Sequence, residues 1–262
     1  MGKVFVVTNR KGGCGKSFTT ANLGFALARH GKKVLCIDTD NQHSLTISMG
    51  VNEPDGLTIT ITTIISDIIN KKDFDPTAGI IHHVEGVDLM PANISLTGIE
   101  LILAPLYGRE IILRKYINKV KSLYDYCLID TSPTLDILTI NALAAADSAI
   151  IPVTPRFLDA KGLELLLRSI AGIREDINPD LDISGILMTM VDKRTNFSKE
   201  IISIIEQAYG KSIHIFKDHI PHSIRAAESS ARGMSIFKHD PNGKVAAAYE
   251  SVAQVLLAGG CL

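Results

Sequence analysis

The chain has 262 residues, of which 46% are hydrophobic and 21% charged, and its formal net charge at pH 7 is −1. This length fits one large α/β domain, and we expect residues 1–262 to form a single domain because no Pro/Gly/Ser-rich linker divides them. The near-neutral charge excludes a uniformly basic nucleic-acid-binding protein, and the lack of a long apolar stretch argues against a membrane-spanning helix.

Apolar runs alternate with helical segments along the chain. We expect strands at Val4–Thr8, Val34–Asp38, Cys127–Asp130, Ala149–Val153 and Ile183–Val191. We expect helices at Phe18–His30, Leu163–Ile173 and Ala246–Leu256. This alternation predicts βαβ units, and therefore an α/β fold with a mainly parallel twisted sheet and helices on both faces. Because the first strand begins almost at the N-terminus, we expect no signal peptide and a cytoplasmic protein.

A glycine-rich loop joins the first strand to the first helix, and it reads Arg10-Lys11-Gly12-Gly13-Cys14-Gly15-Lys16-Ser17. Glycine lets successive backbone N–H groups point into one concavity, to which the following helix adds its positive N-terminal end. Such a concavity suits a polyphosphate. We expect Lys16 between the β- and γ-phosphates, and we expect the hydroxyl of Ser17 to be a Mg²⁺ ligand.

The loop departs from the usual phosphate-loop pattern, G-x-x-x-x-G-K-[ST], at its first position. Arg10 stands where that pattern has glycine, and a second lysine, Lys11, follows it. The order x-K-G-G-x-G-K-[ST] resembles the deviant Walker A loop of the ParA/MinD family of dimerising ATPases. The resemblance implies a P-loop NTPase with ATP and Mg²⁺ as cofactors. It also implies nucleotide contacts from Lys11, Gly12, Gly13, Cys14, Gly15, Lys16, Ser17 and Phe18.

Two carboxylates, Asp38 and Asp40, lie at the end of the second expected strand. Buried charge there requires a nearby cation or a catalytic role, although two aspartates that cap the next helix are an alternative. The order Asp-x-Asp-x-Gln resembles the switch I element of the ParA family, which usually has proline where Asn41 stands. The resemblance implies that Asp40 orients or activates the hydrolytic water and that Asp38 supports Mg²⁺ and its waters.

The middle of the chain contains one ambiguous segment and one clear strand end. Thr58–Ile69 suits a strand by propensity, but we predict a short helix. Asp130 ends an apolar strand, as a Walker B carboxylate that holds Mg²⁺ through water must. Thr131-Ser132-Pro133 then resembles switch II, where the family more often has two prolines, and residues 138–147 also resemble ParA proteins.

Two segments near the C-terminus, residues 189–195 and 220–228, resemble ParA elements that flank adenine and line a non-specific DNA surface. The resemblance implies nucleotide contacts from Met190 and from Pro221, of which Pro221 is the candidate adenine contact.

The same two segments supply the candidate DNA contacts. The resemblance implies these contacts for Arg194 and Arg225, whereas His222 replaces an arginine that is frequent in the family, which would weaken DNA binding or make it pH-sensitive. Residues 188–244 hold nine Lys/Arg against six Asp/Glu, a net charge of +3. Surface lysines without a partner would give the same count.

The four cysteines show no C-x-x-C spacing. We expect Cys36, Cys127 and Cys261 to be small apolar residues. Cys14 lies in the glycine-rich loop, where a helix N-terminus and Lys16 could lower its pKa, but a packing role is the simpler expectation.

The resemblance to small ParA ATPases covers nearly the whole chain, with residues 51–85 poorly matched. It implies a slow, partner-stimulated ATP hydrolase in which Lys11, Lys16 and Asp40 are catalytic. ATP would drive a homodimer, with Lys11 reaching the neighbour's phosphates. The dimer would bind double-stranded DNA without sequence specificity, work with a ParB-like protein, and segregate chromosome or plasmid DNA or position cargo over the nucleoid.

Three alternatives use the same fold or loop. A MinD-like positioning ATPase that cycles on membranes requires a basic amphipathic helix at the C-terminus, but no Lys or Arg follows Lys244, so we expect no membrane partner. A nitrogenase iron-protein type of reductase requires cysteines that share a cluster between subunits, which Cys36 and Cys127 within strands do not suit. A scaffold without ATPase activity conflicts with the intact set of lysines and aspartates.

Overall fold

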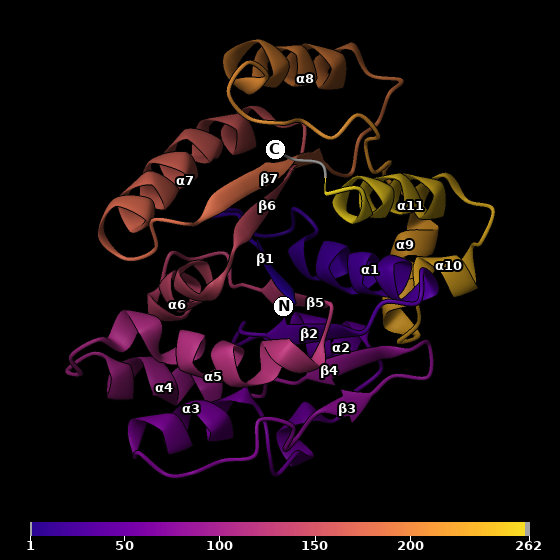
Figure 1. The fold of residues 1–262 in the computed structure, drawn as a ribbon. Coiled ribbons are helices and arrows are strands. Elements are labelled where there is room, and N and C mark those ends of the chain that lie inside the picture. The colour runs from indigo at the N-terminus through magenta and orange to yellow at the C-terminus, as the bar shows by residue number, and fades with distance from the viewer. Residues whose placement is uncertain (1, 260–262) are drawn as a thin grey trace.

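The computed structural model describes residues 2–259, apart from the side chains of Leu158 and Ala160. Within these residues the chain forms a seven-stranded sheet with the order β3-β4-β2-β5-β1-β6-β7 (Figure 1). Neighbouring strands are parallel except β3 and β4, which are antiparallel. The strands are β1 (Lys3–Val7), β2 (Val34–Asp38), β3 (Ile81–His82), β4 (Val87–Met90), β5 (Tyr126–Asp130), β6 (Ser148–Val153) and β7 (Asp182–Met188).

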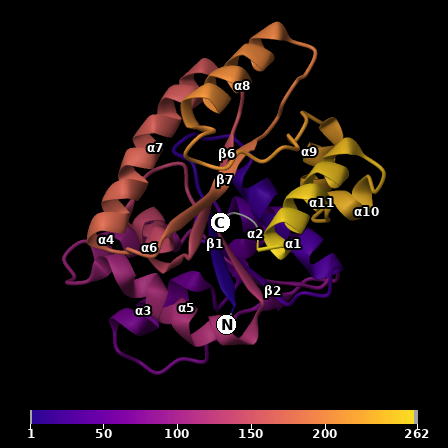
Figure 2. The ribbon, with the colours of Figure 1, turned by 45° about the horizontal axis from the view of Figure 1, so that its top comes forward.

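Helices cover both faces of this sheet, as expected, and Figure 2 shows the two groups on opposite sides. One face carries α3 (Ile61–Ile69), α4 (Leu96–Leu103), α5 (Ile112–Val120), α6 (Ile137–Ala145), α7 (Phe157–Asp176) and α8 (Asn196–Tyr209). The other carries α1 (Lys16–Arg29), α2 (Ser44–Ser48), α10 (Ile236–His239) and α11 (Lys244–Leu257), with α9 (Ile224–Ala231) packed on α2 and α10. Short 3₁₀ turns lie at Pro54–Gly56, Arg109–Ile111 and Lys121–Leu123.

Strand β1 shows why the apolar runs of this sequence become strands. Successive side chains of a strand point to opposite faces, so a strand with helices on both sides must be apolar throughout. Val4 and Val6 pack in the core beneath α3 to α8, while Phe5 and Val7 pack in the core beneath α1 and α11. All four side chains are buried.

A glycine sets the distance between α1 and the sheet. A Cβ atom added at Gly24 would lie 2.7 Å from the Sγ atom of Cys36 on β2. Glycine therefore lets the helix pack closely against the strand. Cys36 and Cys127 are both buried, as expected for small apolar residues, whereas Cys261 lies outside the described residues.

The sequence-based expectations differ from the structure mainly in element length. Thr58–Ile69 contains helix α3, so the prediction of a helix is confirmed. Helix α7 runs from Phe157 to Asp176 and includes Gly162, which we expected to precede it. Strands β3 and β4 were not expected at all, and β7 ends at Met188, earlier than the predicted end. Among residues 2–259, no helix is both long and apolar enough to cross a membrane.

Candidate nucleotide site

The glycine-rich loop lies between β1 and α1, at the carboxyl end of a central strand. Gly13 and Gly15 adopt positive φ angles of 70° and 84°, which other residues rarely adopt, and Gly15 directly precedes α1. Lys16, only 7% exposed, turns back so that its Nζ donates to the carbonyl oxygen of Lys11 at 3.1 Å. The loop is also tied to the end of β7, because the Thr189 hydroxyl donates to the carbonyl oxygen of Cys14 at 2.8 Å.

Two buried aspartates end adjacent strands beside this loop. Asp38 of β2 and Asp130 of β5 are register partners, and neither is exposed. Asp38 is fully engaged by the protein, since Oδ1 accepts from the backbone N–H of Asp40 at 3.0 Å and Oδ2 accepts from the N–H and hydroxyl of Thr46 at 2.8 and 2.7 Å. Asp130 is not fully engaged. Its Oδ1 accepts from the Thr20 hydroxyl at 3.2 Å, but its buried Oδ2 has no hydrogen-bond partner among residues 2–259.

The protonation of these two aspartates reflects their burial. Burial raises the pKa of Asp38 to about 6, although hydrogen bonds from Thr46 oppose the shift. Burial also raises the pKa of Asp130, and the nearby Asp38 adds to the rise, while hydrogen bonding from Ser17 and the charge of Lys16 oppose it. A buried carboxylate pair with one unpartnered oxygen is an arrangement that a hard divalent cation would stabilise. The chemistry of Asp130, with its unpartnered oxygen, therefore suits Mg²⁺, and Ser17 and Asp38 lie beside it.

Asp40 lies in the loop after β2 and is 6% exposed. Its backbone N–H donates to Asp38, and its Oδ1 accepts from the backbone N–H of Gln42 at 3.0 Å. The loop thus fixes the Asp40 carboxylate close to the two strand-end aspartates. The structure brings together all three carboxylates that the sequence singled out.

Lys11 contacts a carboxylate that the sequence analysis missed. Its Nζ lies 4.0 Å from Oδ1 of Asp159, in the first turn of α7, and the Lys11 side chain is 46% exposed while that of Asp159 is 2% exposed. Oδ2 of Asp159 accepts from the Thr154 hydroxyl, and within the described part of the chain Oδ1 has no hydrogen-bond partner. Asp159 follows β6, the neighbour of β1, so its position after a parallel strand was the one available signal.

A pocket of about 230 Å³ opens next to the loop. Four residues expected to contact the nucleotide line it, namely Gly15, Phe18, Met190 and Pro221. Tyr249 of α11, which was not expected, also lines it and lies edge-on to Phe18 with ring centroids 5.7 Å apart. The mainly apolar lining and the aromatic walls suit a flat heterocyclic base.

Backbone pairing brings the two C-terminal segments to this pocket. The N–H of Val191 donates to the carbonyl oxygen of Ile220 at 3.0 Å, and the N–H of His222 donates back to that of Val191 at 3.2 Å. Residues 220–222 therefore run parallel to the chain that leaves β7, and Pro221 comes to lie near Met190.

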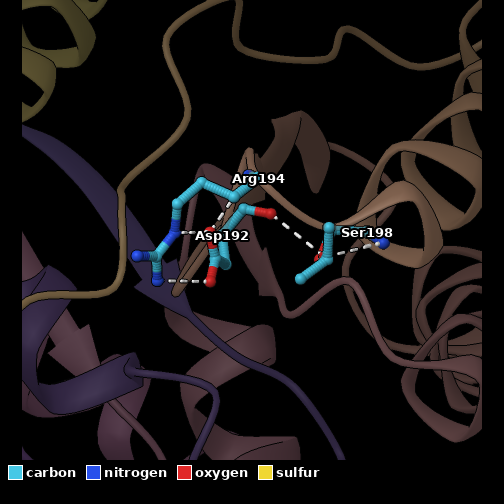
Figure 3. A network of polar contacts seen from close by, with 4 residues as sticks. Asp192, Arg194 and Ser198 are labelled. Carbon is cyan, nitrogen blue, oxygen red and sulfur yellow. Dashed lines mark hydrogen bonds and ion pairs between the residues drawn. The ribbon is translucent and has the colours of Figure 1, made fainter.

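The two candidate DNA-contacting arginines lie on different elements. Arg194 belongs to the loop between β7 and α8 and lines a second, larger groove of about 830 Å³. Arg225 is exposed on α9 and does not line that groove. Figure 3 shows Arg194 paired with Asp192, with Ser198 of α8 close by.

Comparison with known proteins finds relatives that match nearly the whole chain. A family model described as an AAA domain matches residues 2–183. The sporulation initiation inhibitor protein Soj of Bacillus subtilis is 36% identical over 260 residues, which are 99% of this chain and 100% of that protein. The chromosome partitioning protein ParA of Caulobacter vibrioides is 32% identical and covers 97% of this chain and 94% of its own length.

A solved structure is also similar to this chain over nearly its whole length. The cobyrinic acid a,c-diamide synthase of Mycobacterium smegmatis with bound ADP and magnesium is 33% identical, has a TM-score of 0.84, and covers 98% of this chain and 94% of its own. The same protein has been solved with an ATP analogue and magnesium. These comparisons bear out ATP and Mg²⁺ as cofactors for proteins of this kind.

Proposed function

The chain belongs to the ParA family of chromosome-partitioning ATPases, and from this premise we propose that it is an ATP-driven dimer that binds DNA without sequence specificity. We further propose that a ParB-like partner stimulates its slow hydrolysis of ATP, and that the cycle segregates chromosome or plasmid DNA, or positions cargo, over the nucleoid. The observation that carries the proposal is the placement of the glycine-rich loop, three carboxylates and a base-sized pocket at one edge of the sheet.

Each residue of this site has a proposed task. The loop amides and Lys16 hold the phosphates, and Phe18, Met190 and Pro221 hold the base. Ser17 and Asp130 would hold Mg²⁺, directly or through water, and Asp38 would support its waters. When bound, Mg²⁺ would offset the charge of the phosphates. Asp40 orients the attacking water, for which its fixed carboxylate near the loop is suited.

Lys11 has to change partner in this cycle. Here it lies 4.0 Å from the buried Asp159 of its own chain. To reach the phosphates of a second subunit, it has to leave that carboxylate, and ATP supplies the stronger concentration of negative charge. The monomer then becomes competent to dimerise only when nucleotide is present.

Pairing two subunits also explains why DNA binding should require ATP. One subunit offers a segment with a net charge of only +3, and non-specific affinity rises with the number of phosphates neutralised. Two such segments in a dimer double that number. Arg194 and Arg225, which are both exposed, are the proposed contacts.

The test measures dimerisation and DNA binding in the same samples. Sedimentation with a non-hydrolysable ATP analogue should show a wild-type dimer, and titration onto two unrelated duplexes should give equal, salt-dependent affinities near 10⁻⁴–10⁻⁶ M. Lys11→Ala should bind the analogue but remain monomeric and lose DNA binding. Arg10→Ala, which removes the neighbouring exposed cation, is the matched control and should dimerise normally.

Arg225→Glu separates the DNA surface from the dimer. It should still dimerise but should bind both duplexes more weakly, by the same factor. Lys115→Glu, which reverses an exposed charge on α5, should bind like the wild type. A wild-type protein that dimerises with ATP but never retains DNA would exclude the proposed DNA-binding activity.

A further inference from the structure

Asp192 and Arg194 form a closed pair in the loop between β7 and α8 (Figure 3). Among the residues that the structure describes, three hydrogen bonds reach the Asp192 carboxylate, and all come from Arg194. Oδ1 accepts from the backbone N–H at 3.0 Å and from Nε at 2.9 Å, and Oδ2 accepts from Nη2 at 2.8 Å. The Arg194 side chain is nevertheless 90% exposed, so solvent and any large ligand can reach it.

Hydrogen bonds of Thr195 fix the conformation of the loop that carries this pair. The Thr195 hydroxyl accepts from the backbone N–H of Ser198 and so caps α8. The Thr195 hydroxyl also donates to the backbone carbonyl oxygen of Asp192 at 3.2 Å. The backbone turn that carries Arg194 is therefore held by Thr195, and it does not depend on the side-chain pair between Asp192 and Arg194.

The pair lies on the wall of the groove of about 830 Å³. Lys193 and Lys244 also line this groove, together with His219 and His222. A phosphate backbone that entered it would meet several cationic or hydrogen-bonding side chains. Asp192, however, offsets the charge of Arg194, so Arg194 adds no net charge to the groove while it is paired.

The atoms that Arg194 gives to Asp192 are those that bind a phosphate side-on. The Nε and Nη2 N–H groups form the fork that matches two oxygens of a carboxylate or a phosphate. We propose that Asp192 competes with DNA phosphates for Arg194, and that Asp192 therefore limits the strength of DNA binding. This inference rests on the proposed DNA-binding function and adds a residue that regulates it.

The size of the effect follows from the exposure of the pair. Exposed ion pairs are weak, so a phosphate can displace Asp192 but loses affinity in doing so. Asp192→Asn removes the competing charge, while its amide oxygen can still accept the backbone N–H of Arg194 and keep the turn. We expect this variant of the full chain, with ATP analogue, to bind a random duplex about two- to fivefold more tightly at low salt.

Salt dependence gives a second readout. Because Asp192 keeps Arg194 from its phosphate in part of the wild-type complexes, Asp192→Asn should steepen the slope of log K against log salt by up to about 0.9 for each subunit. Asp218→Asn is the matched control. Asp218 is exposed and lines the same groove, but it accepts from Ser251, and no arginine pairs with it among the described residues. This control should change the affinity by less than about twofold.

An Arg194→Ala background completes the test, because Asp192→Asn should add nothing beyond the Asp218→Asn effect once the arginine is gone. Equal affinities of wild type and Asp192→Asn, or equal gains from both aspartate variants, would overturn the inference and leave DNA binding intact. If no variant binds DNA although all dimerise with ATP analogue, the proposed DNA-binding function fails, and this inference fails with it.

Discussion

Asp40, for which we propose a role in hydrolysis, is held by contacts with its own loop. Its backbone is held by Asp38 and its side chain by the N–H of Gln42. Asp40→Ala should lower the rate of ATP hydrolysis by at least about a hundredfold, the lower range for a positioned acid or base. ATP affinity should hardly change, because the carboxylate acts on water. Phosphate release and nucleotide titration measure the two effects.

Asn41→Ala is the control for this change. Asn41 follows Asp40, and among residues 2–259 its side chain hydrogen-bonds only to the side chain of Gln42. This variant should hydrolyse ATP at the wild-type rate. An Asp40→Ala protein with unchanged turnover would move the proposed role to Asp38.

Residues that follow apolar strands could be predicted to form one site, but residues that come from helices packed against the sheet could not. The loop, Asp38 and Asp130 each follow an apolar strand, and parallel strands end at one edge, so their proximity follows from the pattern. Asp159 and Tyr249 belong to α7 and α11. Only the position of Asp159 after the parallel strand β6 gave a sequence signal, whereas the position of Tyr249 depends on how α11 packs, which no local pattern encodes.

At the scale of elements, long apolar strands were predicted and short ones were missed. Strand β3 has only two residues and is partly exposed, and β4 has four, so neither shows a sustained apolar run. Helix α7 passes through Gly162, where an added Cβ would meet no atom within 4 Å. Gly162 therefore does not mark the start of the helix as expected, because the open space around it and the flanking apolar positions let the helix pass through it. The expectation of a single domain over residues 1–262 stays a prediction.

The contact between α1 and β2 gives an element-scale prediction. Gly24→Ala should lower the free energy of unfolding by about 1–3 kcal/mol, because the new methyl group would lie 2.7 Å from Sγ of Cys36. In a Cys36→Ala background the same change should be neutral or stabilising, since the clash is gone and alanine favours a helix over glycine by about 0.5–1 kcal/mol. Urea unfolding of the four proteins measures this reversal of sign.

Gly162→Ala serves as the control, because it makes the same substitution in a helix with open space. It should stabilise the protein in either background. A Gly24→Ala effect that is identical with and without the Cys36 sulfur would mean that the close approach is not limited by that atom.

For the molecule as a whole, bound nucleotide should stabilise the folded state, because it would contact distant parts of the chain. The residues that line the pocket come from the start of α1 and the loop before it, the segment after β7, residues 220–223, helix α9 and helix α11. Mg²⁺ and ATP at a hundredfold excess over Kd should add about 2.7 kcal/mol to the free energy of unfolding. For a protein of this size that should raise Tm by roughly 5–10 °C.

Lys16→Ala should abolish this rise in Tm, because the loop keeps its amides but loses the charge that faces the phosphates. Lys33→Ala, which removes an exposed lysine beyond α1, should keep the rise in full. Differential scanning calorimetry with and without Mg²⁺ and ATP compares the three proteins. A Lys16→Ala protein that is stabilised as much as the wild type would contradict the placement of the phosphates at the loop.

The order of strands also dictates when the sheet can form during synthesis. Strand β1 lies between β5 and β6, and β2 lies between β4 and β5, so the two N-terminal strands have no direct contact with each other in the sheet. Lys3 pairs with Tyr126, and this long loop must close before β1 gains its central neighbour. At about 5–20 residues per second, the ribosome takes roughly 6–25 s to supply β5. Throughout that interval the apolar β1 has no strand to pair with, and the nascent chain is open to aggregation and to chaperones.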